Sequence, residues 1–77
     1  MKFVIIVPCY NEEAVLPETT YQLSRVLDGL LERGVIGHGM ILYVDDGSKD
    51  ATWGLIQKYA EENPYVEGLK LAHNVGH

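Results

Sequence analysis

The stretch Tyr43-Val44-Asp45-Asp46-Gly47-Ser48-Lys49-Asp50 places two adjacent carboxylates between an apolar segment and a Gly-Ser turn. The apolar segment, Met40 to Val44, has the length and composition of a buried strand. A second polar cluster, Pro8 to Glu13, directly follows another apolar segment, Phe3 to Val7. Because open α/β sheets bind ligands just outside the carboxyl ends of their strands, both clusters are expected at one edge of one sheet. The sequence therefore predicts a binding site formed by these two loops.

The rest of the chain alternates predicted strands and helices in the order β-α-β-α-β. The first helix is expected to begin near Leu16–Pro17 and to end at Arg33-Gly34. The second helix is expected to end at Asn63-Pro64, and a third strand to cover Val66 to Leu71. Right-handed crossovers would make the strands parallel, with helices packed on the sheet faces. The predicted fold class is α/β, and residues 1–77 are predicted to be the N-terminal nucleotide-binding part of an incomplete Rossmann-like domain.

Local patterns refine this assignment. Pro8 is expected to end the first strand, because proline cannot donate to a central ladder, and that strand is expected to be buried on both faces. Asp50 or Ser48 is expected to cap the second helix, and Trp53 to pack between that helix and the sheet. The apolar stripe of the first helix is Leu16, Thr20, Leu23, Leu27, Leu30 and Leu31, and the inner face of the second is Leu55, Ile56, Tyr59 and Ala60.

Composition excludes several classes of protein. The net charge of −5, with six scattered Lys and Arg residues, argues against a nucleic-acid partner, because phosphate binding needs clustered cations. The apolar run Phe3 to Tyr10 is far too short to span a membrane. The single cysteine, Cys9, cannot form an internal disulfide and is expected to be a small buried residue. These features predict a cytoplasmic location.

Familiar phosphate-binding motifs do not fit these loops. The loop after the first strand has no glycine, so the dinucleotide fingerprint G-x-G-x-x-G is absent. A dehalogenase-type phosphatase would need a carboxylate where Val44 stands. A receiver domain would need an acidic pair after its first strand and an aspartate after its third, and here the third strand is followed by Ala72-His73-Asn74. Recognition of a base and ribose remains. Carboxylates accept hydrogen bonds from a nucleobase or from ribose hydroxyls, which suits Asp45 and Asp46 to the uncharged end of a nucleotide.

The motifs together resemble the N-terminal portion of family 2 glycosyltransferases, which have the GT-A fold. The resemblance extends in particular to the polyprenyl-phosphate sugar transferases, that is, bactoprenol glucosyltransferases and relatives of dolichol-phosphate mannosyltransferase. It covers essentially the whole chain. The segments that carry it are Val4-Ile5-Ile6-Val7-Pro8-Cys9-Tyr10-Asn11-Glu12-Glu13, Val44-Asp45-Asp46-Gly47-Ser48-Lys49-Asp50-Ala51-Thr52 and Asn74-Val75-Gly76-His77.

The resemblance implies a set of nucleotide-binding residues. Pro8 and Tyr10 would flank the base, with the tyrosine ring stacked on it, and Asp46 would contact the base edge. Glu12 would lie near the ribose, and Asp45 is included with the expected role of orienting the turn. No catalytic residue and no metal ligand is expected among these 77 residues.

The third segment and the missing motifs set further expectations. Asn74 and Gly76 would pass near the nucleotide, and His73 stands where the family often has arginine. The family's Asp-x-Asp metal motif, its catalytic carboxylate and its acceptor region would lie beyond His77. The resemblance therefore implies a divalent cation, Mg or Mn, for the parent enzyme, and little or no activity for this fragment alone.

The implied reaction is transfer of a hexose, with inversion, from a UDP- or GDP-sugar to a lipid-phosphate acceptor at the cytoplasmic face of a membrane. The residues also allow an alternative from another class. A non-catalytic small α/β module could bind a nucleotide or a partner and form homo-oligomers through its exposed sheet edge, since open edges invite pairing.

Overall fold

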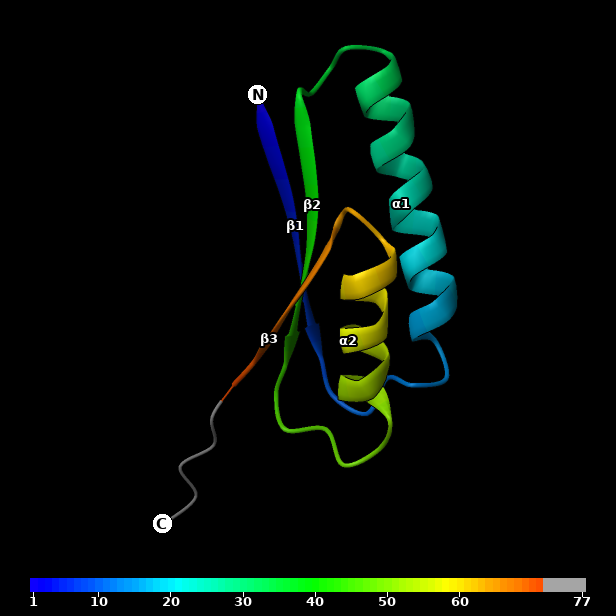
Figure 1. Ribbon diagram of the computed structural model, residues 1–77, viewed down its shortest axis with the longest axis vertical. Helices are drawn as coiled ribbons and strands as arrows, with labels where there is room; N and C mark the ends of the chain where they lie inside the picture. The colour runs from blue at the N-terminus through cyan, green and yellow to red at the C-terminus, as the bar shows by residue number, and fades with distance from the viewer. Residues whose placement is uncertain (72–77) are drawn as a thin grey trace.

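A computed structural model describes residues 1–71 and contains a parallel three-stranded sheet with two helices (Figure 1). Along the chain the elements are β1 (Lys2–Cys9), α1 (Leu16–Glu32), β2 (His38–Asp45), α2 (Thr52–Glu62) and β3 (Val66–Lys70). The strand order in the sheet is β1-β2-β3, so consecutive strands are neighbours. The predicted β-α-β-α-β order and the parallel sheet are confirmed.

The first strand is longer than predicted. It pairs with β2 from Lys2 opposite His38 to Cys9 opposite Asp45, so it continues through Pro8. The expectation that Pro8 ends the strand is therefore wrong. The carbonyl oxygen of Cys9 accepts a hydrogen bond from the Asp46 N–H, so the backbone of Cys9 faces β2. The nitrogen of Pro8, one residue earlier, faces away from β2, where no strand formed by residues 1–71 needs a ladder donor.

Both helices cover the same face of the sheet (Figure 1). Each right-handed crossover moves the chain one strand in the same direction, which places α1 and α2 on one side. The opposite face, here called the open face, has no element over it among residues 1–71. Val4, Ile6 and Leu69 on this face are 40%, 64% and 49% exposed. The expectation that the first strand is buried on both sides is therefore wrong for the described residues, and the predicted packing of helices on the sheet is found on one face of it.

The core lies between the sheet and the two helices. The predicted stripe of α1 faces it, with Leu16, Thr20 and Leu27 buried. On α2 the inward residues include Thr52 and Ile56, and Trp53 packs against the core as predicted. Ala60 is exposed, which corrects its predicted place on the inner face. The buried apolar side chains are Cys9, Leu16, Leu27, Ile36, Ile41, Tyr43, Ile56 and Val66.

Helix ends follow the predicted residues in part. Gly34, just beyond α1, has the left-handed φ of 70° that its predicted role as a stop requires. Asn63 ends α2. At the start of α2 the cap position is Ala51, and the Asp50 carboxylate accepts a hydrogen bond from the Thr52 N–H at 2.9 Å. Ser48, the alternative cap, instead bonds to Asp45.

Candidate functional site

The end of β2 places the two predicted carboxylates in different environments. Asp45, the last residue of β2, is fully buried, and its Oδ2 accepts a hydrogen bond from the Ser48 N–H at 3.3 Å. Its Oδ1 accepts a hydrogen bond from the Ser48 hydroxyl. Asp46 is exposed, and its N–H donates to the carbonyl oxygen of Cys9 at 2.9 Å. Gly47 then turns the chain with a left-handed φ of 86°. Asp45 thus holds the turn, while Asp46 faces outward.

Two loops meet at this edge of the sheet. The first loop is residues 10–15, between β1 and α1, and the second loop is residues 46–51, between β2 and α2. Tyr10, at the start of the first loop, is 51% exposed, and Pro8 just before it is exposed as well. Asn11 follows with a left-handed φ of 51°, a conformation that asparagine tolerates better than most residues. The tyrosine ring is therefore accessible next to a sharp bend.

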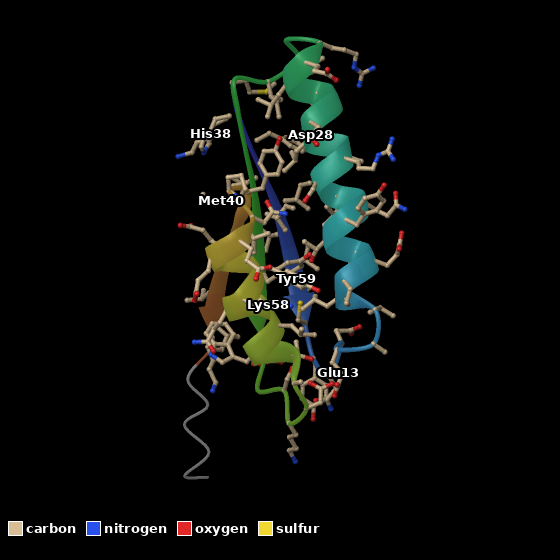
Figure 2. The ribbon with its side chains drawn as sticks, turned by 45° about the vertical axis from the view of Figure 1, so that its right-hand side comes forward. Glu13, Asp28, His38, Met40, Lys58 and Tyr59 are labelled. Atoms are coloured by element: carbon tan, nitrogen blue, oxygen red, sulfur yellow. The ribbon has the colours of Figure 1, made fainter. Side chains whose placement is uncertain are left out.

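Hydrogen bonds join the first loop to the second loop and to the start of α2. Three successive backbone N–H groups of the first loop donate to side chains of the other segment. They run from Asn11 to Ser48 Oγ (2.8 Å), from Glu12 to Thr52 Oγ1 (2.8 Å) and from Glu13 to Asp50 Oδ2 (3.4 Å). Two bonds run in the opposite direction, from Lys49 N–H to Asn11 Oδ1 (2.8 Å) and from Ala51 N–H to Glu13 Oε1 (3.3 Å). In Figure 2, Glu13 lies at the end of the molecule where both helices begin. The two loops thus form one surface.

The predicted site residues lie together in part. Pro8, Tyr10 and Glu12 come from the end of β1 and the first loop, and Asp46 from the second, so the prediction of a shared edge is confirmed. Their contacts with a nucleotide stay predictions. Asp45 lies behind this surface, in the orienting position expected for it. Asn74, Gly76 and His73 fall outside the described residues.

Sequence reasoning missed the residues that connect the loops. Asn11, Ser48 and Thr52 supply these contacts, and none of them was among the predicted site residues. A signal was present, because Ser, Thr, Asn and Asp side chains readily bond to nearby backbone groups in turns. That signal indicates local turns, however, whereas Asn11 and Ser48 bond to each other across 37 residues of sequence.

Electrostatics at the site favour neutral groups of a ligand over phosphate. Besides Lys49, the charged residues of the two loops and the end of β2 are the acidic Glu12, Glu13, Asp45, Asp46 and Asp50. The hydrogen bond from the Thr52 hydroxyl, followed by those from backbone N–H groups, lowers the pKa of the Asp50 carboxyl below its ordinary value. A carboxylate surface of this kind accepts hydrogen bonds and repels anions.

Cys9 lies directly below the two loops. Its side chain is only 2% exposed, and burial, together with the charges of Glu12 and Asp45, raises the pKa of the thiol from 9.0 to about 11. The thiolate is the reactive form of cysteine, so this residue is a packing element, as predicted.

Other features of the described residues bear on function. A hollow of about 520 Å³ lies at the far end of the strands, lined by Asp28, Leu31, Glu32 and Tyr65, away from both loops (Figure 2 labels Asp28). Within residues 1–71, no group of three or more His, Cys, Asp or Glu side chains could hold a metal ion. Neither α1 nor α2, the helices of that same range, has the length and apolarity needed to cross a membrane.

Comparison with known proteins gives a consistent result. The family model described as "Glycosyl transferase family 2" matches residues 4–77. The uncharacterized glycosyltransferase YkoT of Bacillus subtilis (strain 168) is 55% identical over 74 residues, which are 95% of this chain and 22% of that protein. A prophage bactoprenol glucosyl transferase homolog of Escherichia coli (strain K12) is 36% identical over 76 residues, 99% of this chain and 23% of that protein.

A eukaryotic protein belongs to the same group of relatives. The dolichyl-phosphate beta-glucosyltransferase of Dictyostelium discoideum is 35% identical over 74 residues, 94% of this chain and 23% of that protein. No solved structure gives a significant match. The chain thus spans less than a quarter of the length of these relatives. Because the family model matches from β1 to the last residue, the chain belongs to glycosyl transferase family 2.

Proposed function

We propose that these residues form the nucleotide-sugar-binding portion of an inverting glycosyltransferase. The whole protein would transfer a hexose from a UDP- or GDP-sugar to a polyprenyl phosphate. The observation that carries the proposal is the joined pair of loops, which keeps exposed Tyr10 and exposed Asp46 on one edge of the sheet. The names of two relatives, a bactoprenol and a dolichyl-phosphate glucosyltransferase, support a glucosyl group and a polyprenyl acceptor.

The chemistry of the two loops suits the base and ribose of the donor. The ring of Tyr10 offers a face for stacking, and Pro8 adds a rigid apolar wall. The Asp46 carboxylate can accept a hydrogen bond from the N–H of a uracil or guanine ring. The acidic surroundings repel the diphosphate, which would therefore extend away from the loops and carry the attached sugar with it.

The proposed reaction forms one bond and breaks one. An oxygen of the lipid phosphate attacks the anomeric carbon of the sugar as the bond from that carbon to the nucleoside diphosphate breaks, and UDP or GDP leaves. A divalent cation, Mg or Mn, is expected for the whole enzyme. Residues 1–71 do not supply a cluster of ligands for it.

Equilibrium binding tests the proposal on the full-length protein. Isothermal titration with UDP and with GDP should give saturable binding of one of them. Asp46→Asn keeps the shape of the side chain and removes its charge, so we expect about 10- to 100-fold weaker binding. The matched control is Glu67→Gln, a charge removal on exposed β3, which should leave the Kd unchanged. If the full-length protein binds neither UDP nor GDP, the proposal is refuted.

One observation favours a second candidate function. The open face carries apolar side chains, with Ile6 64% and Leu69 49% exposed, and a protein surface of this kind promotes association. A small α/β module that binds a nucleotide or partner and self-associates would account for it. Light scattering of the chain should then give a dimer or larger species, and Ile6→Lys should shift it to monomer. A monomer before the substitution would count against this candidate.

A further inference from the structure

We propose that Asn11 and Ser48 are positioning residues, which hold Tyr10 and Asp46 at a fixed separation for nucleotide binding. This inference rests on the proposed function and concerns residues that contact no ligand themselves. It starts from the two direct bonds of Asn11 to the second loop. Its N–H donates to Ser48 Oγ and its Oδ1 accepts from the Lys49 N–H, each at 2.8 Å. A single asparagine thus bonds to the side chain of Ser48 and to the backbone of Lys49.

Ser48 connects this contact to the sheet. Its hydroxyl accepts the hydrogen bond from Asn11 and donates its own hydrogen to Asp45, which is fully buried at the end of β2. The Ser48 N–H also donates to Asp45, at 3.3 Å. The continuous path from β2 through Asp45, Ser48 and Asn11 therefore fixes the first loop to the most buried strand of the sheet.

The positions of the linked residues explain why the path matters for binding. Asn11 is next to Tyr10 in the chain, and Ser48 is two residues after Asp46. Among residues 1–71, Asn11 is the one non-glycine residue with a left-handed backbone. This conformation turns the chain directly after the tyrosine, and such constrained residues cluster at binding sites. If either link is lost, the Asp46 N–H still donates to the Cys9 carbonyl, but the first loop is held less firmly beyond the tyrosine, so the stacking ring gains freedom to move relative to the carboxylate.

The first loop has a second attachment that keeps the fold when the path is cut. The Glu12 N–H donates to Thr52 Oγ1 at 2.8 Å, and Thr52 is fully buried at the start of α2. Removing the Ser48 hydroxyl should therefore loosen the site without unfolding the loop. We therefore expect a higher Kd for the nucleotide, with the number of binding sites per protein molecule unchanged.

The test measures UDP and GDP binding by titration calorimetry on the full-length protein and its variants. Ser48→Ala removes the hydroxyl that joins Asn11 to Asp45, and Asn11→Ala removes the acceptor of the Lys49 N–H. Each should raise the Kd about 10-fold while the binding stoichiometry stays at its original value. Ser48→Thr keeps a hydroxyl and should restore the Kd to within about twofold. The matched control is Ser24→Ala. It removes a hydroxyl that accepts from Asn63 Nδ2 at 2.9 Å, remote from both loops, and should leave the Kd unchanged.

The outcomes separate this inference from the proposed function. A purely structural role would lower the stoichiometry at constant Kd, because part of the protein would be unfolded, and that result would overturn the inference. An unchanged Kd in both alanine variants would overturn it as well, with nucleotide binding by the unaltered protein still standing. Failure of the unaltered protein to bind UDP or GDP would overturn the proposed function and this inference together.

Discussion

The hydroxyl oxygens of Thr20 and Tyr43 lie 2.6 Å apart in the interior, where α1 packs on β2. Both side chains are buried, and burial raises the pKa of Tyr43 above its ordinary value. The bond satisfies the polar end of the largest fully buried side chain. It also fixes α1, which follows the first loop, to the strand that ends in Asp45.

A double-mutant cycle on this pair is the first prediction. Tyr43→Phe should lower the free energy of unfolding by about 1–3 kcal/mol, because it leaves the Thr20 hydroxyl buried without its partner. Thr20→Val should lower the free energy of unfolding by a similar amount, because it leaves the Tyr43 hydroxyl buried without its partner. The double variant should lose less than the sum of the two, since it buries neither unpaired group. Urea unfolding followed by the fluorescence of Trp53, the single tryptophan, gives these values; simple additivity would show that the bond is not stabilising.

Gly68 on β3 lies directly against side chains of α2. A Cβ atom at this position would stand 2.4 Å from Cγ2 of Ile56 and 3.3 Å from the Trp53 ring. Gly68→Ala should therefore push α2 away from the sheet and cost about 1–3 kcal/mol of unfolding free energy. The change should appear as a lower urea midpoint and a shift in the Trp53 emission spectrum.

Gly54 provides the matched control for that substitution. It lies within α2, and a Cβ atom there would meet nothing within 4 Å. Gly54→Ala should raise the unfolding free energy by about 0.5–1 kcal/mol, because alanine loses less backbone entropy in a helix. Equal effects of the two glycine substitutions would contradict close packing of α2 on β3.

Much of the fold could be predicted from the sequence because its signals are local. The leucine spacing of α1, the stop at Gly34 and the boundary at Asn63 act within one or two turns, and the structure has each of them. The prediction that Pro8 ends β1 was wrong, because the effect of a proline depends on whether its nitrogen faces a neighbouring strand. Within residues 1–71 the predicted burial of β1 on both sides was wrong for a related reason, since a sequence run does not show which elements cover a sheet.

The site was predictable as a place but not as a set of contacts. Parallel strands bring their carboxyl ends to one edge, so Tyr10 and Asp46 could be placed together from the pattern alone. The partners of Asn11 could not, because they depend on the register that sets Cys9 opposite Asp45. A shift of that register would move Ser48 relative to the first loop and change every bond between the two loops.

Cys9 is predicted to be unreactive in the folded protein. A pKa of about 11, two units above the ordinary 9.0, leaves about 100-fold less thiolate at pH 8. Burial of the sulfur slows the reaction further. Alkylation by iodoacetamide should therefore be at least about 100-fold slower in the native protein than in guanidinium chloride. An exposed thiol introduced by Ala60→Cys should react at nearly the same rate in both states. Rapid native labelling of Cys9 would show that the region below the loops opens readily.

The last prediction concerns pH and the attachment of the two loops. The Thr52 hydroxyl, and to a lesser degree the N–H groups of Thr52 and Glu13, stabilise ionised Asp50 and lower its pKa from the ordinary 3.8. A carboxyl group with a lowered folded-state pKa contributes stability above its unfolded-state value, and this contribution is lost as pH falls through the folded-state value.

The stability difference between the unaltered protein and Asp50→Asn should therefore be largest above about pH 4 and shrink at lower pH. Urea midpoints measured from about pH 6 down to about pH 2.5 give this difference directly, and the variant removes the titration of Asp50 alone. Glu61→Gln, an exposed carboxyl group on α2, is the control for a general loss of negative charge. A stability difference that stays constant over the whole pH range would mean that the folded state does not stabilise the ionised form of Asp50 relative to the unfolded state.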